Sequence, residues 1–352
     1  MSNKIAVIGG INMDISATMT APLALRDSIP GKVSMSSGGV ARNIAHNLRL
    51  LGHDVHLVSV LGGDIFGRIC HEQCTELGLD LSLTERIGDM RNGLYLCVND
   101  PHGDMVTAVA DMDIVARISP KFLSERIDAI NQSAVVIADT NITADSLQYL
   151  LDHCTVPLMV DTVSTAKAPR IAQAMRQSTT HHLHTLKLNR QEALAMTECD
   201  TVESAAALLT ALGVQHVYIT LGREGVYCSN GSQHEHFAAI PTQVVNTTGA
   251  GDAFVAGLAH ALMQGVSWPD CTTWAQQAAH SALLTPMTVN PYIASLMLTS
   301  KCTMHNAQVG TAPPCRPPRQ KVMLNAALLA DGTPVPSLSG CSLDICSLKT
   351  KN

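Results

Sequence analysis

Residues 242–265, TQVVNTTGAGDAFVAGLAHALMQG, carry the clearest structural pattern in the chain. The short apolar run at 242–245 predicts a strand, and the apolar stretch from residue 253 to Gly265 predicts a helix. Gly249 and Gly251 stand between them, where a residue without a Cβ lets the backbone approach a ligand closely. A strand that turns into a helix is the repeating unit of an α/β fold.

The same turn is the strongest candidate for chemistry. The amides of Gly249, Ala250 and Gly251 point out of a helix start, where the helix dipole favours anions such as phosphate oxygens. Asp252 follows the glycines into the first helical turn, and its carboxylate would accept a proton from an alcohol as a general base. The alternative is a glycine-rich turn whose acid merely complements the dipole.

The chain up to about residue 290 alternates strands with helices. Short apolar runs predict strands at 4–9, 56–61, 134–138, 156–160, 184–188 and 216–221. Helical patterns that end before a glycine occupy 41–51, 66–77 and 202–212. This alternation predicts an α/β fold in which a mostly parallel central sheet is covered by helices on both faces.

Two stretches, 15–36 and 93–110, break the alternation. They predict short hairpin strands, the second with a turn at Asp-Pro-His-Gly, residues 100–103. A small β-lid beside the main domain would explain both. Because an exposed sheet edge is normally covered, we expect a homodimer that pairs through the lid.

Regular patterning ends near Pro291. Residues 299–352 contain APPCRPPRQ and DGTPVPSLSG and show no sustained periodicity. We therefore expect one domain over residues 1–298, which includes the lid, and an irregular, disordered C-terminal tail over 299–352. A functional tail and an artefact of the coding sequence are the alternatives.

Bulk composition limits the partners and the compartment. The net charge of −6 and the lack of a basic stripe argue against a nucleic-acid partner. No secretory signal and no apolar run of about 20 residues is evident, which argues against a membrane protein. The eleven cysteines are scattered and predict reduced thiols in a cytoplasmic protein. The groups at 70–74 and 181–184 lack a second ligand pair at zinc spacing, so buried residues are favoured over a metal site.

Two further motifs place polar residues near strand or helix ends. Ser37-Gly-Gly-Val-Ala-Arg-Asn43 exposes backbone amides beside a side-chain amide that could bind hydroxyl groups; an ordinary loop and helix is the alternative. Asn12 and Asp14 lie just past the first strand, at the end where open α/β sheets bind ligands. The spacing around them is not that of a dinucleotide fingerprint.

Together these motifs resemble the PfkB (ribokinase-like) carbohydrate kinase family. The segments that contain Asn43 and Asp252 look like its two signatures, in the right order. Lys187-Leu-Asn-Arg-Gln-Glu192 is similar to its N-x-x-E motif. Residues 220–225 look like its nucleotide-binding strand end, and 288–291 like its adenine-side loop. The resemblance covers about residues 4–295 and implies a ribokinase-like three-layer α/β/α sandwich with a β-lid, in an enzyme that phosphorylates an alcohol group.

The resemblance also implies ATP and Mg²⁺ as cofactors and a role for each motif. Asp252 would be the base, and the amides of residues 249–251 would stabilise the transferring phosphoryl group. The hydroxyls of the substrate sugar would bind Asn12, Asp14, Gly39 and Asn43. The metal, mostly through water, and the nucleotide would lie among Asn189, Glu192, Thr220, Gly222, Gly225 and Asn290.

Within the family, the segments PGKVSMSSGGVARNIAHNLRLLG, VADMDI, ADTNI and VDTVSTAK are most similar to the pseudouridine kinase branch. That similarity implies phosphorylation of the 5′-hydroxyl of pseudouridine. Four residues in or beside these segments would recognise the base or be ordinary polar loop residues: Asp111, Asn141, Asp161 and Lys167.

Other functions remain open at this point. Another family kinase would act on ribose, adenosine or inosine. A catalytically impaired family member would bind such a ligand without turnover. A hydrolase that uses Asp252 to activate water is disfavoured, because no second carboxylate or dinuclear metal cluster is evident.

Overall fold

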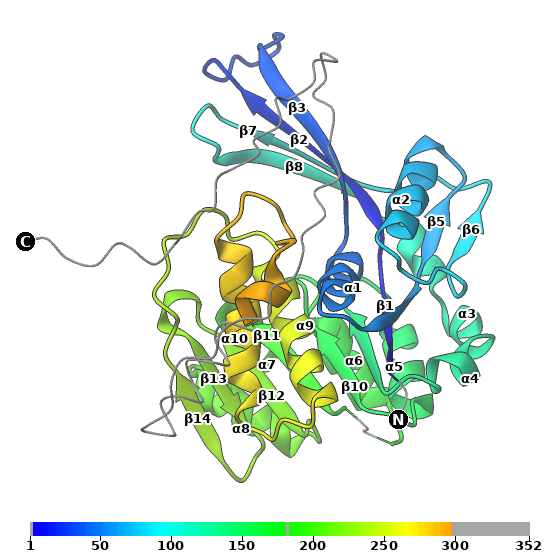
Figure 1. Cartoon of the computed structure of the whole chain (residues 1–352), viewed down its shortest axis with the longest axis vertical. Coiled ribbons are helices and arrows are strands. Elements are labelled where there is room, and N and C mark those ends of the chain that lie inside the picture. The colour runs from blue at the N-terminus through cyan, green and yellow to red at the C-terminus, as the bar shows by residue number, and fades with distance from the viewer. Residues whose placement is uncertain (1–2, 181–182, 298–352) are drawn as a thin grey trace, which may run out of the picture. The chain divides into compact units, whose positions relative to one another are not determined.

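A computed structural model describes residues 3–180 and 183–297 (Figure 1). Its central sheet has the strand order β14-β13-β12-β11-β10-β9-β1-β4. Every neighbouring pair from β12 to β4 is parallel, whereas β13 and β14 add antiparallel strands at one edge. The strands are β1 (Lys4–Ile8), β4 (Asp54–Val58), β9 (Val135–Asp139), β10 (Leu158–Asp161), β11 (Thr185–Asn189), β12 (His216–Thr220), β13 (Val226–Ser229) and β14 (His234–Phe237).

Helices cover both faces of this sheet, because alternate strand residues point to opposite sides. Ile5 and Val7 of β1 pack into one buried cluster with one helical layer, and Ala6 and Ile8 pack into a second cluster with the other. The first layer contains α1 (Val40–Leu50), α2 (Ile65–Glu76), α9 (Ala250–Met263) and α10 (Cys271–Leu283). The second contains α3 (Pro120–Ser124), α4 (Ile127–Ile130), α5 (Ala144–His153), α6 (Pro169–Gln177), α7 (Arg190–Thr197) and α8 (Val202–Ala211). The expected three-layer fold is confirmed.

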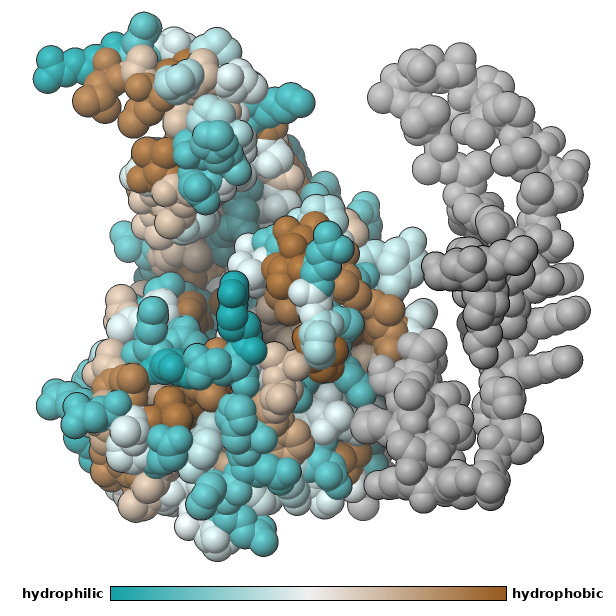
Figure 2. All heavy atoms as spheres, turned by 90° about the vertical axis from the view of Figure 1, so that its left-hand side faces the viewer, coloured by the Kyte–Doolittle hydropathy of each residue, from teal (hydrophilic) through white to brown (hydrophobic). Residues whose placement is uncertain are grey.

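The lid is a separate four-stranded sheet in the order β3-β2-β7-β8. Its strands are β2 (Asn12–Met19), β3 (Gly31–Gly38), β7 (Gly93–Asn99) and β8 (Met105–Asp111). Val33, Met35 and Val109 are 69%, 61% and 63% exposed. Figure 2 shows apolar residues at the surface of the lid, at the top of the molecule. An exposed apolar sheet face is unusual for an isolated domain.

The structure also contains a few short elements. Strand β5 (Val60–Gly62) pairs with β6 (Glu85–Ile87), and η1 (Asp113–Arg117) and η2 (Gly222–Glu224) are short 3₁₀ helices. None of the helices among the described residues reaches the length and apolarity that a membrane span requires. The expected tail, 299–352, lies outside the described residues, so the tail and its boundary remain predictions.

Three sequence expectations were wrong in detail. No strand forms at 242–245, where Val244 and Val245 are exposed and the Val245 amide bonds to the Leu283 carbonyl instead of to a sheet. The run 56–61 is two strands, because the chain leaves the main sheet at Ser59, whose hydroxyl bonds to the Gly9 carbonyl. The lid segment predicted to begin at residue 15 begins at Asn12, so Asp14 lies inside the lid strand β2.

Candidate active site

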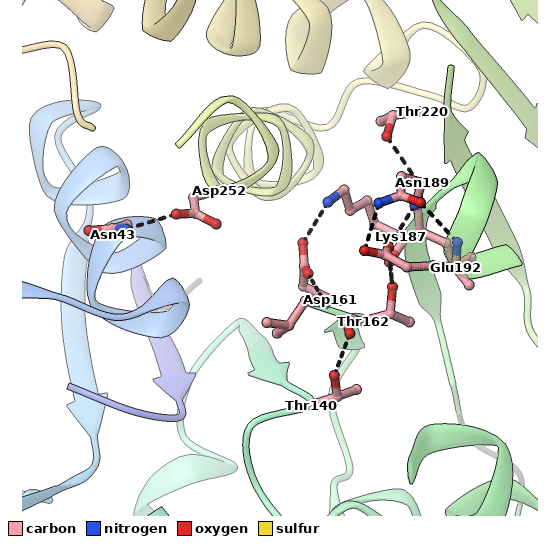
Figure 3. Close-up of polar contacts among 11 residues, drawn as sticks. Asn43, Thr140, Asp161, Thr162, Lys187, Asn189, Glu192, Thr220 and Asp252 are labelled. Carbon is pink, nitrogen blue, oxygen red and sulfur yellow. Dashed lines mark hydrogen bonds and ion pairs between the residues drawn. The ribbon is translucent and has the colours of Figure 1, made fainter. Parts of the chain in front are cut away.

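The candidate site lies at the carboxyl edge of the parallel strands, where α/β sheets bind ligands. Asp139, Asp161 and Lys187 stand at or near the ends of β9, β10 and β11. Asn43 comes from the first turn of α1, and Asp252 from the first turn of α9. Figure 3 shows the Asn43–Asp252 pair and the Lys187–Asp161 pair on either side of the start of α9. Segments far apart in sequence therefore converge on one place.

Asp252 is buried and is held by a residue 209 positions away. The Nδ2 of Asn43 donates to its Oδ2 at 2.9 Å. Nη1 of Arg42 donates to the Asn43 Oδ1 at 3.2 Å, which turns the amide so that its donor faces Asp252. The carboxylate is therefore held by a tertiary contact as well as by its place in the first turn of α9.

Burial, the largest cause, and the nearby negative charge of Asp161 raise the pKa of Asp252 to about 7. The hydrogen bond from Asn43 and the positive charge of Lys187 act in the opposite direction. A carboxylate whose pKa lies near neutrality is matched to the task of taking a proton from an alcohol.

The glycine turn before Asp252 has no room for side chains. Gly249 is the N-cap of α9 with φ 83°, and a Cβ there would lie 2.0 Å from the Thr288 carbonyl oxygen. A Cβ on Gly251 would lie 2.9 Å from Nζ of Lys187. The first amides of α9 have no acceptor within the helix, and a lysine ammonium lies beside them. This combination is suited to bind an anion.

Lys187 is a functional candidate that the sequence reasoning missed as an individual residue. Its Nζ lies 3.0 Å from Oδ2 of Asp161, and both side chains are buried. Burial lowers the pKa of Lys187, but the carboxylates of Asp161, Glu192 and Asp252 outweigh that effect and raise it. The ammonium therefore stays charged. A lysine in the buried run TLKLN was the available signal, because lysines are rarely buried without a partner.

Asn189 and Glu192 form a reciprocal capping box at the start of α7. The Glu192 carboxylate accepts from the Asn189 backbone N–H at 2.8 Å, from its Nδ2 at 2.7 Å and from the Thr162 hydroxyl at 2.7 Å. Among the described residues no group of three or more His, Cys, Asp and Glu side chains could hold a metal ion directly. The engaged carboxylate fits Mg²⁺ through water rather than by direct ligation, because Mg²⁺ keeps several waters.

The residues expected to bind sugar hydroxyls meet at the base of the lid. Nδ2 of Asn12 donates to Asp14 Oδ1 at 2.5 Å. Burial raises the pKa of Asp14, while Asn12 and Arg42 oppose the increase. A Cβ on Gly38 would lie 2.0 Å from Asp14 Oδ2, so the carboxylate occupies the space that a side chain there would need. Gly39 follows as the N-cap of the helix that carries Asn43.

A second missed residue, Asp139, links this region to the loop after β9. Its Oδ2 accepts the Ala41 N–H at 3.0 Å and its Oδ1 the Asn141 N–H at 2.8 Å. Burial raises the pKa of Asp139 to about 6. Lys167 Nζ donates to Asn141 Oδ1 at 2.5 Å, so these two predicted base-side residues are in contact.

The residues predicted to bind the nucleotide lie on different elements of the fold. Thr220 ends β12 and its hydroxyl bonds to the Leu188 carbonyl. Gly222 begins the η2 turn and Gly225 directly follows it. Asn290 is buried, with its Nδ2 on the Ser281 carbonyl at 2.7 Å and its Oδ1 on the Tyr292 N–H at 2.9 Å. Its amide therefore braces its own loop, and its contact with adenine stays a prediction.

Other sequence candidates lie apart from the cluster or outside the description. Asp111 is exposed at the end of β8. Cys70 and Cys74 are buried free thiols that pack in the core beside α1, as expected for structural residues. His181 and His182 lie outside the described residues.

Comparison with known proteins agrees with this geometry. A model of the pfkB family carbohydrate kinases matches residues 2–294. The pseudouridine kinase of Escherichia coli (strain K12) is 33% identical over 85% of this chain and 97% of its own length. An uncharacterized sugar kinase of the same organism, YeiI, is 33% identical over 82% of this chain and 80% of its own length. The structure of Arabidopsis thaliana ribokinase complexed with ribose and ATP matches with a TM-score of 0.72 and 20% identity, over 84% of this chain and 99% of that one.

Proposed function

The chain belongs to the pfkB family of carbohydrate kinases and is a phosphotransferase that acts on a hydroxyl group, and on that premise we propose that it phosphorylates the 5′-hydroxyl of pseudouridine with ATP. The observation that carries the catalytic part is the buried Asp252, with its pKa near 7, beside the glycine-spaced amides at the start of α9. This arrangement places a base and an anion site within one helical turn.

In the proposed reaction, the substrate oxygen attacks the γ-phosphorus while the bond from that phosphorus to the β–γ bridging oxygen breaks, which releases ADP. Asp252 takes the hydroxyl proton and later returns it to solvent. The Gly251 and Asp252 amides and the Lys187 ammonium stabilise charge on the transferring group. The Ala250 amide, which the sequence also predicted for this role, donates instead to the Thr247 carbonyl at 3.3 Å. Asn43, predicted to bind a ribose hydroxyl, instead orients the Asp252 carboxylate, to which its amide donates. Asn12, Asp14 and Gly39 position the ribose hydroxyls.

Asn189 and Glu192 would hold Mg²⁺ through its waters, and the ion would neutralise phosphate charge when bound. Thr220, Gly222 and Gly225 would line the nucleotide, and Asn290 would shape its adenine end through the loop that it braces. These assignments follow the family motifs and, for Asn189 and Thr220, the position of each residue at the carboxyl end of a strand.

Two facts support pseudouridine as the substrate: the 33% identity to the E. coli pseudouridine kinase across nearly its whole length, and the segments of this chain that resemble that branch. YeiI is equally similar, so a different sugar or nucleoside is the competing substrate. The predicted cytoplasmic location is compatible with the seven described cysteines, all of which are free thiols.

The test is an ATP-dependent phosphorylation assay of full-length protein and of a version truncated near residue 300. We expect pseudouridine to give a kcat/KM at least about tenfold above those of uridine, inosine, adenosine and ribose, because a site that hydrogen-bonds a base rejects analogues that leave its polar groups unpaired. Mass spectrometry of the product locates the phosphate. Preference for another substrate would overturn the pseudouridine assignment and leave the kinase assignment in place.

The proposed homodimer would cover the apolar face of the lid. Ile15, Met35, Leu96 and Val109 are lateral neighbours across its four strands, so they share one face. Replacing Met35 by lysine should shift the protein toward monomer, measured by sedimentation at several concentrations, because a charge would enter the apolar interface. Ser34→Lys places the same charge on the opposite face and serves as the control. A wild-type protein that is monomeric at all concentrations would contradict the dimer.

A further inference from the structure

The helices α1 and α9 contact each other through polar side chains at both ends. Near their first turns, Asn43 of α1 donates to Asp252 of α9 at 2.9 Å. At the opposite end, Nε2 of His53 lies 2.8 Å from Nδ1 of His260, which belongs to the last turn of α9. Because like ends meet, the two helices run parallel. The second contact lies about 12 Å beyond Asp252, which follows from the rise per residue of a helix.

His53 lies just after α1 and is fixed to it by its backbone. The His53 N–H donates to the Leu48 carbonyl and the Gly52 N–H donates to the Arg49 carbonyl, both at 3.1 Å. These two bonds form a Schellman motif, in which a residue with positive φ, here Gly52 at 89°, ends the helix. The base of the His53 side chain therefore keeps its position relative to the last turn of α1, and a movement of α1 against α9 changes its distance from His260.

The histidine pair is suited to form a hydrogen bond. His53 is 2% exposed, and its Nδ1 lies 3.3 Å from Oδ1 of Asn3. Burial lowers the pKa of His53 more than the negative charge of Asp54 raises it, so the ring is neutral at pH 7. A neutral imidazole has one donor and one acceptor nitrogen, so the ring can serve as either partner of the bond. Loss of His260 would leave a buried nitrogen of His53 without this partner, which costs free energy.

Helix α1 is directly connected to the lid. The lid strand β3 ends at Gly38, and Gly39 is the N-cap of α1, so a displacement of the lid acts on the end of α1 that carries Asn43. Apolar packing also joins α1 and α9 in one buried cluster, but that packing has no preferred direction. A hydrogen bond tolerates only a narrow range of distance and angle. Two such bonds, one at each end, restrain both the sliding and the pivoting of α1 against α9.

We infer that His53 and His260 are positioning residues for catalysis: the bond between them fixes α1 against α9 and thereby keeps the Asn43 amide on the Asp252 carboxylate. The inference rests on the proposed role of Asp252 as the base and deepens it. It places a requirement for that role at the opposite end of the two helices, outside the site that binds the substrates.

Leucine and amide variants of the pair test this inference. His53→Leu and His260→Leu remove the bond, so the hydrogen bond from Asn43, which lowers the pKa of Asp252, should weaken. The acidic limb of the kcat/KM profile should therefore move to higher pH by about 0.5 unit or more. His53→Gln and His260→Asn place an amide atom where the bonded ring nitrogen lies and should keep the limb within about 0.2 unit of wild type. Both His260 variants lose the ring contact with Trp274, so their difference reports the polar contact.

Removing Asn43 tests whether the pair acts through it. Asn43→Ala should shift the acidic limb by itself, and adding His53→Leu should shift it by no more than about 0.2 unit further, because the bond that the pair supports is already absent. Shifts that add would show that His53 acts on Asp252 by another route and would overturn the inference. A lower Tm with an unmoved limb in both leucine variants would also overturn it, since that result describes a purely structural pair.

An NMR titration of isotope-labelled aspartates measures the pKa of Asp252 without turnover, with its signal assigned by its loss in Asp252→Asn. A wild-type protein that phosphorylates none of the substrates, or whose kcat/KM does not fall below pH 7, would reject the proposed function of Asp252. The titration still decides the inference in that case. An Asp252 pKa that rises in the leucine variants and returns in the amide variants supports the positioning role, and an unchanged pKa overturns it.

Discussion

Replacing Asp252 by asparagine should lower kcat by about a thousandfold or more, with the Kd values of nucleoside and MgATP within about threefold of wild type. The change removes the proton acceptor but keeps the shape of the side chain, and general-base catalysis contributes factors of about 10² to 10⁴. Single-turnover kinetics and calorimetric titration measure the two quantities separately. Asp270→Asn, the same change at an exposed position at the start of α10, controls for a nonspecific effect of removing a negative charge.

The same variant should be more stable than wild type, increasingly so at high pH. The pKa of Asp252 is about 7 in the folded protein, against 3.8 for an ordinary aspartate. Between pH 3.8 and about 7 the folded state therefore keeps the proton of Asp252, whereas the unfolded state loses it. The stabilisation that this proton gives the folded state is lost as the pH rises through about 7. Asparagine has no such loss. The gain in Tm of the variant over wild type should be larger at pH 8 than at pH 5. In the wild type, kcat/KM should fall below pH 7, because Asp252 is then protonated. A gain in Tm that does not vary with pH would show that the pKa of Asp252 is not raised in the folded protein.

Replacing Lys187 by methionine should be the most destabilising of the proposed changes. It leaves Asp161 as a buried carboxylate without its ammonium partner at 3.0 Å. Removing one member of a buried ion pair costs about 3–5 kcal/mol, measurable as the free energy of unfolding in urea. Activity should fall with it, and the acidic limb of the pH–rate profile should move to higher pH, because Lys187 lowers the pKa of Asp252.

A second substitution separates the structural loss from the catalytic one. Asp161→Asn combined with Lys187→Met removes both members of the buried ion pair, so most of the stability should return. Activity should not return, because the ammonium beside Gly251 is still absent. Recovery of kcat in the double variant would mean that Lys187 serves only the fold.

The fold could be predicted because local patterns and tertiary structure agree over most of the chain. The run at 4–9, the helix before Gly52 and the glycine turn before Asp252 form as their residue patterns indicate. The run at 242–245 did not, because an apolar run predicts a strand only if a neighbouring strand is available, and here α10 supplies the partner. The break at Ser59 depends on a contact with Gly9, 50 residues away, which no local pattern contains.

The motifs that carry Asn43 and Asp252 could be named from the sequence, but the electrostatics around them could not. The hydrogen bond between these two side chains is a finding of the structure, and their roles stay predictions. Lys187 and Asp139 were missed because each lies at the end of a run that reads as an ordinary buried strand. The contacts that single them out are with Asp161 of β10 for Lys187 and with the Ala41 N–H of α1 for Asp139. The orientation of Asn141 likewise depends on Lys167, 26 residues further along the chain.

One consequence follows from the place of Asp14. The carboxylate belongs to β2, a strand of the lid, whereas Asp252 belongs to a helix on the main sheet. Any displacement of the lid therefore carries Asp14 with it and changes the separation of the two acids. By thermodynamic reciprocity, a sugar that binds both groups must favour one lid position, and whatever restrains the lid must alter the affinity for sugar to the same degree.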